Sequence, residues 1–284
     1  MPPLRTGKYR QFFDDHAEEI SLLTLEFSGY NLRTIDDTAI RNWLTQFRDD
    51  HLNVAVKLLH HVDYYDGPRV LGEQKKLHQQ LLILNATEKR RILFCPFGQA
   101  GKSSGVLLHQ FKLANEFSGA QWNKRFVYQT ELSKPIYSER DDLLFAFIDD
   151  FVGTGDQITG KDKTQDDWSK IDGLIHPNNK VYLCVLSATE DGVKHIQRKT
   201  RLQVVTNKIL LERDKIFSPR NATFTRNEKQ ILREYCEKAD SEQPFGYGNC
   251  QTTVAFYFRT PDNTIAILRA NNPPKWKGLF VRNL

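Results

Sequence analysis

The stretch FAFIDDFVGTGDQITG, residues 145–160, decides how this chain is interpreted. Four apolar residues run directly into Asp149 and Asp150, and a Gly-Thr-Gly turn begins three residues later. An apolar run that ends in a glycine-rich turn is typical of a buried strand. Three interpretations are open: the acidic end of an ATPase strand, a sugar-binding carboxylate pair with its own phosphate loop, or a buried strand ending in a polar turn.

Similar apolar runs surround this stretch and alternate with helical segments. The strand candidates are RILFCPFG (91–98), RFVYQTEL (125–132), LLFAFID (143–149), KVYLCVLSA (180–188) and LQVVTNKIL (202–210). The clearest helices between them are residues 104–117 and 190–199. This alternation predicts an α/β fold with a mainly parallel central sheet flanked by helices. Ligands of such sheets bind at the carboxyl ends of the strands, where the two polar loops of the chain fall.

The region before the first strand has a helical pattern from about residue 10 to residue 88. In AIRNWLTQF (39–47) the apolar residues recur at helical spacing, and Thr34 with Asp37 could cap that helix. VLGEQKKLHQQLLIL (70–84) repeats the pattern. His60, His61 and His78 lack a cysteine or carboxylate at metal spacing and are interpreted as ordinary helix residues. We therefore predict an N-terminal helical module over residues 1–90.

The region after residue 210 changes pattern again. Thr225 and Glu228 form a capping-box pattern before KQILREYCEKA (229–239), which predicts a short helix. QTTVAFYFRTPDNTIAILR (251–269) is interpreted as strand, turn, strand. We predict that residues 91–284 form the core of the protein, with this C-terminal β-hairpin as a hood.

Composition limits the class of protein. The 284 residues are 39% hydrophobic and 11% aromatic, enough for a packed core. The net charge of +5 is too small to identify a nucleic-acid binder. The four cysteines show no CxxC pairing, so a disulfide framework or zinc site is not expected. The first residues lack an apolar signal region, and LLFAFI is too short to span a bilayer, so we expect a soluble cytoplasmic protein.

The first polar loop, CPFGQAGKSSG (95–105), contains GKSS and resembles the end of a Walker A loop. The ATPase pattern requires a glycine five residues before Gly101, and Pro96 stands there. Proline fixes φ and removes an N–H from a loop that must offer N–H groups to phosphate. This residue disfavours a P-loop ATPase, although the order of strand, loop and helix is right.

The second polar loop, residues 153–157, explains more of the sequence. Small residues let the backbone approach a ligand closely, and N–H groups at a helix start favour a phosphate. Asp149 and Asp150 can each accept hydrogen bonds from hydroxyl groups, such as the neighbouring hydroxyls of a ribose. A carboxylate pair beside a phosphate loop is complementary to ribose 5-phosphate.

FAFIDDFVGTGDQ (145–157) resembles the phosphoribosyl-pyrophosphate (PRPP) binding motif of the type I phosphoribosyltransferases, and the resemblance extends over about residues 92–206. It implies that Asp149 and Asp150 hold the ribose hydroxyls and take part in binding Mg²⁺. It also implies two anion-binding loops. The 5-phosphate loop comprises Gly153, Thr154, Gly155, Asp156 and Gln157, and the pyrophosphate loop comprises Gly98, Gln99, Ala100, Gly101, Lys102 and Ser103.

The tail carries a second resemblance. GYGNCQTTVAFYFRTPDNTIAIL (246–268), with the final Trp276, Leu279, Phe280 and Arg282, looks like a divergent phosphoribosyltransferase-like branch found in bacterial conflict systems. Members of that branch occur in anti-phage cassettes, including some retrons. The resemblance implies a ribose-phosphate or nucleotide ligand, and a reverse transcriptase, non-coding RNA or DNA and a DNA-binding protein as partners.

The phosphate loop departs from the metabolic pattern Thr-Thr-Gly-Gly-Thr. Thr154 and Gly155 match, whereas Gly153, Asp156 and Gln157 do not. Two like charges ~4 Å apart repel by about 1 kcal/mol in water, so a carboxylate beside a phosphate needs an explanation. Either Asp156 points away at the helix start, or it binds Mg²⁺, or the ligand differs from PRPP.

Other candidate site residues lie on connecting segments. ELSKPIYSERDD (131–142) stands where the type I enzymes close a mobile segment, and Lys134 or Arg140 could stabilise departing pyrophosphate; solvated charges are the alternative. Tyr247, Asn249 and Gln251 are candidate base contacts, with core packing as the alternative. The basic clusters at residues 89–91 and 194–201 could touch nucleic acid, or form a solvated face.

Two functional hypotheses follow. In the first, the chain is an effector component of a retron-type anti-phage defence system that binds PRPP or a related ribose phosphate with Mg²⁺. If catalytic, it displaces pyrophosphate from ribose C1 in a pentosyl transfer. In the second, it is a catalytically inactive scaffold or nucleotide sensor of a defence complex. The altered phosphate loop and the tail motivate the second hypothesis.

Overall fold

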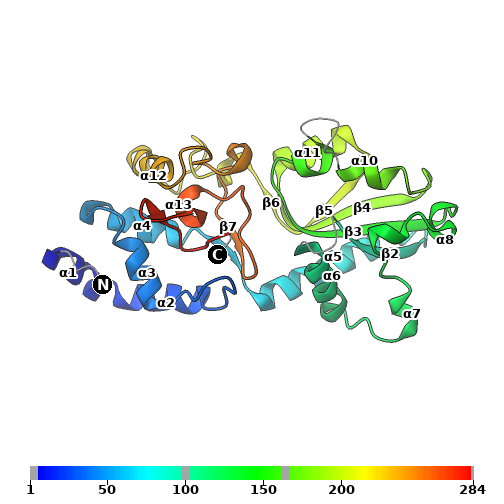
Figure 1. Cartoon of the computed structure of the whole chain (residues 1–284), viewed down its shortest axis with the longest axis horizontal. Helices are drawn as coiled ribbons and strands as arrows, with labels where there is room; N and C mark the ends of the chain where they lie inside the picture. Colours follow the sequence, from blue (N-terminus) through cyan, green and yellow to red (C-terminus); the bar gives the residue numbers. More distant parts are fainter. Residues whose placement is uncertain (1–5, 98–102, 161–166, 283–284) are drawn as a thin grey trace. The chain divides into compact units, whose positions relative to one another are not determined.

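The computed structural model describes residues 6–97, 103–160 and 167–282 (Figure 1). Two compact units make up the chain. Unit 1 comprises Met1–Gly67 and Glu212–Leu284, and unit 2 comprises Pro68–Leu211. The predicted boundary between residues 90 and 91 falls inside unit 2. None of the helices in the described ranges is long and apolar enough to cross a lipid bilayer.

A parallel sheet forms the centre of unit 2. Its strands are β2 (Arg91–Pro96), β3 (Leu143–Val152), β4 (Lys180–Thr189) and β5 (Gln203–Thr206), in that order across the sheet. A short strand, β6 (Ile209–Leu210), pairs with the end of β4, and every pairing in this sheet is parallel. The predicted α/β fold with a mainly parallel sheet is confirmed.

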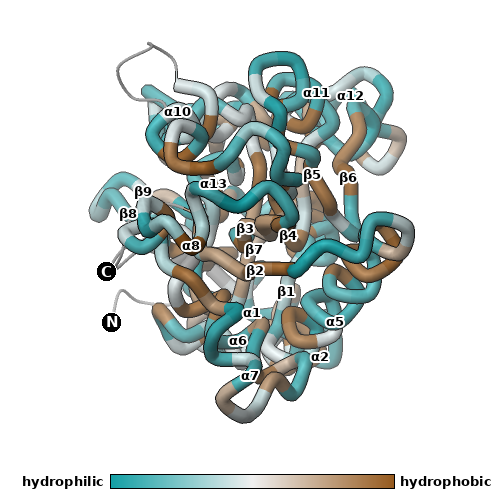
Figure 2. The backbone as a smooth tube through the Cα atoms, turned by 90° about the vertical axis from the view of Figure 1, so that its right-hand side faces the viewer, coloured by the Kyte–Doolittle hydropathy of each residue, from teal (hydrophilic) through white to brown (hydrophobic). Residues whose placement is uncertain are grey.

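Helices cover both faces of this sheet, as the apolar strands predict. On one face lie α5 (Gly67–Leu84) and α6 (Ser103–Ala114), and on the other α10 (Asp167–Asp172) and α11 (Glu190–Lys199) (Figure 1). On the first face Phe94 of β2 packs against Phe111 of α6 and His78 of α5. Helix α11 carries both hydrophilic (teal) and hydrophobic (brown) residues in Figure 2, as expected for an amphipathic helix. Its Ile196 is buried in the core beside the sheet.

The segment between α6 and β3 differs from the prediction. It contains α7 (Ala120–Asn123), the 3-10 helix η2 (Gln129–Glu131) and α8 (Pro135–Ser138). The strand predicted over residues 125–132 is reduced to a single bridge between Phe126 and Phe94. The Glu131 carboxylate accepts the Tyr128 N–H at 3.2 Å at the start of η2, so this backbone group bonds locally and not to a neighbouring strand.

Unit 1 joins the two ends of the chain. Its first part contains α1 (Thr6–Asp15), α2 (Ala17–Phe27), α3 (Asp37–Leu44), η1 (Asp49–His51), α4 (Leu52–Leu59) and β1 (Asp63–Tyr65). Its second part contains η3 (Glu212–Asp214), α12 (Arg226–Ala239), η4 (Tyr247–Asn249), β7 (Val254–Phe256), α13 (Ala266–Arg269), β8 (Asn271–Asn272) and β9 (Trp276–Lys277). Aromatic residues from both parts share one core, including Trp43, Phe47, Trp276 and Phe280.

Two helix caps in unit 1 test the sequence patterns. The capping box of Thr225 and Glu228 is present at the start of α12, as predicted. The start of α3 is capped by Asp36, whose carboxylate accepts the Ala39 N–H at 2.7 Å, and not by the predicted Thr34 and Asp37. Neighbouring acids made the choice ambiguous, because any Asx or Thr side chain can fill this position.

The strand-turn-strand prediction for residues 251–269 is wrong in its second half. Strand β7 pairs in parallel with β1 of the first part, and the expected second strand is replaced by α13. The indole N–H groups of Trp43 and Trp276 both donate to the Ile267 carbonyl, at 3.0 and 2.9 Å. These tertiary bonds fix the backbone of α13, and the antiparallel pair at the C-terminus is β8 with β9.

The four cysteines, all within the described ranges, are buried and form no disulfide. Burial raises the pKa of the Cys95 and Cys184 thiols well above the ordinary range, and that of Cys236 to about 12. A thiol in this state is unreactive and packs as a small apolar group. Cys95 and Cys184 are core residues of unit 2.

Candidate functional site

Asp149 and Asp150 lie near the carboxyl end of β3, between β2 and β4. Asp149 is opposite Val185 of β4 and partly exposed, whereas Asp150 is only 3% exposed. The Asp150 N–H donates to Asp149 Oδ1 at 3.0 Å, which fixes the direction of the first carboxylate. Because successive side chains of a strand point to opposite faces, the two carboxylates leave the strand on different sides.

The loop after β2 begins beside these acids. The Phe97 N–H donates to the Ile148 carbonyl at 3.0 Å, one residue before Asp149. The predicted pyrophosphate-loop residues Gly98, Gln99, Ala100, Gly101 and Lys102 lie outside the described residues, as does the side chain of Ser103 at the start of α6. Pro96 is the last residue of β2, paired with Ile148, and is therefore part of the strand. The role of this loop stays a prediction.

The predicted phosphate loop connects β3 with a short helix, α9 (Asp156–Thr159). The Asp156 N–H donates to Thr154 Oγ1 at 3.2 Å, so the Thr154 hydroxyl keeps its own proton for another acceptor. Within the described ranges, the N–H groups of Thr154, Gly155 and Gln157 donate to no protein acceptor. Three amides and one hydroxyl of this loop are therefore available as donors.

Residues at the start of α11 support the loop from behind. The Thr189 hydroxyl donates to the Gly153 carbonyl at 2.6 Å and accepts the Gly192 N–H at 3.0 Å. A Cβ atom on residue 192 would lie 2.0 Å from the Gly153 carbonyl oxygen, so this close approach requires glycine. Thr189 and Gly192 were not among the predicted site residues. A threonine directly before a predicted helix is the helix-cap signal that could have found them.

The backbone of Gly155 also depends on this packing. Its φ is +81°, in the left-handed region that favours glycine, and a Cβ there would lie 3.1 Å from Cγ1 of Ile196. Gly160 ends α9. The helix after the loop is thus short, in agreement with the interruption by Gly160 in the sequence.

Asp156 stands at the first position of α9 and faces α11. Its Oδ1 lies 3.7 Å from Nε2 of His195, and both side chains are about one-fifth exposed, at 21% each. This contact fits the first of the three predicted alternatives, in which Asp156 points away at the helix start. Gln157, the second residue of α9, is exposed.

The two predicted cations each pair with a carboxylate other than Asp149 and Asp150. Arg140 precedes β3, at the amino end of the strand, and its guanidinium pairs with Asp142, with Nε to Oδ1 at 2.7 Å. Six residues of an extended strand, at about 3.3 Å each, separate Asp142 from Asp149, so Arg140 stands at the opposite edge of the sheet from Asp149. Lys134 caps the start of α8, is exposed, and pairs with Glu131 at 2.7 Å. This arrangement gives no support to a contact of either cation with pyrophosphate.

The predicted base contacts Tyr247, Asn249 and Gln251 belong to unit 1. The Gln251 amide accepts the Phe217 N–H at 3.1 Å and donates to Asn249 Oδ1 at 3.2 Å. The carbonyl of Tyr247 accepts a hydrogen bond from Asn263 at 3.1 Å. These bonds hold a turn together. Asn249 is exposed and Tyr247 and Gln251 are half-buried, so they do not pack in the core, and their role as base contacts stays a prediction.

Arginines from the two basic clusters stabilise loops of unit 2. Arg90 donates to the carbonyls of Asp141 and Asn178 at 2.7 and 2.9 Å. Arg201 donates to the carbonyl of Asn179 at 2.8 Å and pairs with Asp172 at 2.6 Å. Both arginines therefore have structural roles.

The acids fit magnesium only in company with a ligand. The described part of the chain holds no group of three or more His, Cys, Asp or Glu side chains that could bind a metal ion. Mg²⁺ usually keeps several waters and is held by one or two carboxylates together with substrate phosphates. Asp149, the more exposed of the two acids, can supply one such carboxylate.

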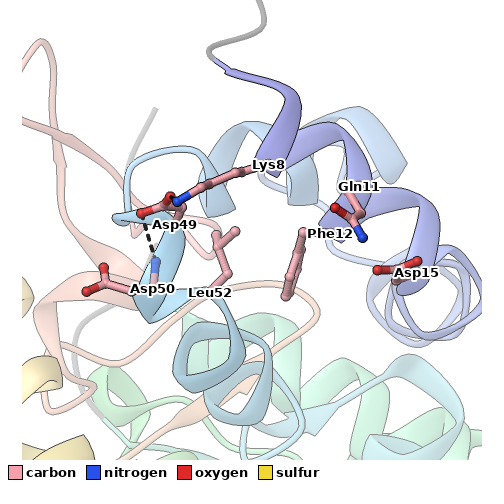
Figure 3. A pocket seen from close by; sticks show the side chains of 7 residues that line it. All are labelled: Lys8, Gln11, Phe12, Asp15, Asp49, Asp50 and Leu52. Carbon is pink, nitrogen blue, oxygen red and sulfur yellow. Dashed lines mark hydrogen bonds and ion pairs between the residues drawn. The ribbon is translucent and has the colours of Figure 1, made fainter.

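A cleft of about 500 Å³ in unit 1 is acidic but already neutralised (Figure 3). It is lined by Lys8, Gln11, Phe12, Asp15, Asp49, Asp50 and Leu52. Lys8 lies 3.3 Å from Asp49, and Arg48 lies 2.7 Å from Asp50. These pairs account for two of the three carboxylates without a metal.

A parallel sheet with two acids at a strand end, followed by a supported glycine-rich loop, defines the class of the phosphoribosyltransferase-like proteins. The model of the PRTase-CE family matches residues 40–282, and the chain belongs to this family. The matched region includes parts of both units, so unit 1 is not an addition outside the family's own pattern. No curated protein matches the chain.

Proposed function

We propose that unit 2 binds PRPP or a related ribose 5-phosphate, together with Mg²⁺, at the carboxyl end of β3. The observation that carries the proposal is the position of Asp149 and Asp150 directly before the loop 153–157, whose Thr154, Gly155 and Gln157 amides have no acceptor within the described ranges. Membership of the PRTase-CE family supports the same ligand class.

Each part of the site matches one part of such a ligand. Carboxylate oxygens accept hydrogen bonds from ribose hydroxyls, and Asp149 is the more accessible of the two acids. The loop amides and the Thr154 hydroxyl donate to phosphate oxygens, and hydrogen bonds to an ionised group are about twice as strong as neutral ones. When bound, Mg²⁺ would neutralise charge on the pyrophosphate, held by the acids and the phosphate oxygens.

Among the described residues, neither of the two predicted cations is placed to assist a transfer. A pentosyl transfer breaks the bond between ribose C1 and the pyrophosphate oxygen and forms a bond from C1 to an acceptor nitrogen. The departing pyrophosphate then needs a positive group. Arg140 stands at the opposite sheet edge and Lys134 is paired with Glu131. For this reason we add a second candidate function, a nucleotide sensor or inactive scaffold that uses the same pocket.

We place this activity in an anti-phage defence system of the retron type. The support is the resemblance of residues 246–268 and 276–282 to the conflict-system branch. Co-expression with a neighbouring reverse transcriptase and its RNA tests the assignment, because a scaffold must copurify with its partners. Loss of phage protection in an Asp149→Asn/Asp150→Asn chain that still copurifies would assign the role to the pocket.

Isothermal titration of PRPP with Mg²⁺ tests the binding site itself. The double variant Asp149→Asn/Asp150→Asn should bind at least about tenfold more weakly than the wild type, because it loses hydrogen bonds to charged acceptors. The matched control is Asp141→Asn/Asp142→Asn, two exposed acids at the amino end of the same strand. Equal heats for the wild type and the Asp149→Asn/Asp150→Asn variant would exclude the sugar-binding role.

Release of pyrophosphate on addition of nucleobases separates the two candidate functions. A transferase releases pyrophosphate in proportion to the acceptor, whereas a sensor binds PRPP with the same affinity and leaves it intact.

A further inference from the structure

His195 of α11 lies behind the phosphate loop and contacts three of its parts. Nε2 is 2.8 Å from Oγ1 of Thr159 and 3.7 Å from Oδ1 of Asp156. A Cβ on Gly155 would lie 3.4 Å from Cδ2 of the same ring, so the ring also packs under the loop backbone. None of the ligand contacts proposed above involves His195.

The hydrogen-bond directions around His195 form one consistent chain. The Arg198 guanidinium, 3.4 Å from Nδ1, can only donate, so Nδ1 accepts and Nε2 carries the proton. Nε2–H then donates to Thr159 Oγ1, and the Thr159 hydroxyl donates to the Gly155 carbonyl at 3.3 Å. The Gly155 carbonyl also accepts the Ile158 and Thr159 amides, both at 3.0 Å, so its orientation is fixed by three donors.

The position of the Asp156 carboxylate decides whether the loop can accept a phosphate. A carboxylate beside a phosphate would oppose binding, and at ~4 Å the repulsion is several-fold stronger in a partly desolvated site than in water. The His195 N–H, 3.7 Å from Oδ1, lies on the side of α11 and turns the positive end of its bond dipole toward the carboxylate.

We propose that His195 is a positioning residue for the phosphate loop. It holds Asp156 and Thr159 toward α11, so that the loop amides and the Thr154 hydroxyl face an anionic ligand without a competing carboxylate. This inference rests on the proposed ribose-phosphate site. In it, the contact between His195 and Asp156 offsets the repulsion that the Asp156 carboxylate would otherwise exert on a phosphate.

Titrations with PRPP and with ribose 5-phosphate, both with Mg²⁺, test the proposal on the wild type and four variants. His195→Ala should weaken binding about five- to tenfold, because Asp156 is released toward the ligand. His195→Gln keeps a donor near the place of Nε2 and should bind within about twofold of the wild type. The double variant His195→Ala/Asp156→Asn should recover most of the lost affinity, since the competing charge is gone. His109→Ala, an exposed histidine of α6, is the control.

The outcomes separate the inference from the proposed function. If His195→Ala binds like the wild type, or if neither His195→Gln nor Asp156→Asn restores affinity, the positioning role is wrong while the ribose-phosphate site stands. If the wild type binds neither probe, the proposed function fails first and the inference fails with it. Thermal melting of each variant verifies that weaker binding does not reflect an unfolded chain.

Discussion

Unit 2 and unit 1 use the sequence in different ways. Unit 2 is one continuous segment, Pro68–Leu211, in which consecutive strands β2, β3, β4 and β5 are neighbours in the sheet. Unit 1 joins residues from the two ends of the chain, and its sheet pairs β1 with β7, nearly two hundred positions apart, from Asp63 to Val254. Unit 2 depends on patterns within short segments, whereas unit 1 depends on contacts between distant residues.

The contacts that hold unit 1 together show what this difference means. Trp43 and Trp276 both donate to one carbonyl, that of Ile267. The Tyr30 hydroxyl bonds to Val281 and to Thr260, and burial raises the pKa of Tyr30 to about 12, with the Thr260 bond and Arg33 opposing the shift. Such contacts are single bonds between remote residues, so loss of one affects a whole unit.

The largest expected effect comes from Trp43→Ala in unit 1. The side chain is 2% exposed, and truncation of a buried tryptophan lowers the free energy of unfolding by about 3–5 kcal/mol. Urea unfolding measures the loss, and hydrogen exchange should show it in α3, α13 and β9 first. Leu25→Ala on α2, where the leucine is 74% exposed, is the control. Equal loss of protection in β3 and β4 would contradict the separation into two units.

A smaller effect is expected from Gly192→Ala in unit 2. The new methyl group would meet the Gly153 carbonyl and Cγ1 of Val152, at 2.0 and 2.8 Å. Relief of this overlap should cost about 1–3 kcal/mol and displace the phosphate loop, which weakens PRPP binding as well. Gly72→Ala on α5, where a Cβ meets nothing within 4 Å, should instead stabilise the chain by about 0.4–1 kcal/mol. An unchanged affinity for PRPP in Gly192→Ala would show that binding does not depend on the packing of α11 against the loop.

Acid should weaken unit 2 before unit 1. Burial against Phe94, Phe111 and Phe117 lowers the pKa of His78, although a hydrogen bond with Asn115 opposes the shift. The unfolded chain therefore takes up the proton first, and the stability of unit 2 falls as the pH drops below about 6.5. His78→Leu should flatten this dependence between pH 7 and pH 5.

The carboxylate of Glu228 in unit 1 responds at lower pH. Burial alone would raise its pKa, but hydrogen bonds from Lys57 and Thr225 outweigh that effect and lower it. Its contribution is present above the ordinary glutamate pKa of about 4.3 and is lost as the pH falls through the lowered value. Hydrogen exchange across the pH range tests whether unit 2 loses stability before unit 1 as the pH falls. Loss of protection in α12 at a higher pH than in α5 would contradict this order.

The smallest effect is expected from Arg140→Ala. The side chain pairs with Asp142 at the amino edge of the sheet, and exposed pairs contribute little to stability. The affinity for PRPP should stay within about twofold of the wild type. A tenfold loss would show that the segment before β3 reaches the ligand, and would restore the role that the sequence suggested for this arginine.

Much of unit 2 could be predicted because its evidence is local. The apolar runs that became β2, β3 and β4 are buried on both faces, and no alternation competes with them. Asp149, Asp150 and the glycine-rich loop could be chosen as candidate site residues because they stand directly at the end of a predicted strand. The strand predicted over residues 125–132 does not form, although its composition is typical of a strand. The Tyr128 N–H bonds instead to the Glu131 carboxylate, and composition does not reveal this hydrogen bond.

The support of the loop could not be predicted from local patterns. Thr189, Gly192 and His195 lie more than thirty residues after the loop, and their role depends on the contact of α11 with Gly153, Gly155 and Asp156. The outcome for residues 264–269 has a similar cause, because two distant tryptophans determine the backbone of α13.

The sequence by itself determined the parallel sheet and the acidic end of β3, and it motivated the proposal of a ribose-phosphate ligand. It could do so because burial of a continuous apolar strand and the needs of a phosphate loop are properties of a few adjacent residues. Only the tertiary structure decided where Arg140 stands, which way Asp156 faces and how unit 1 closes. Those outcomes depend on which remote groups meet, and a donor such as Trp43 or His195 finds its acceptor only after the chain has folded.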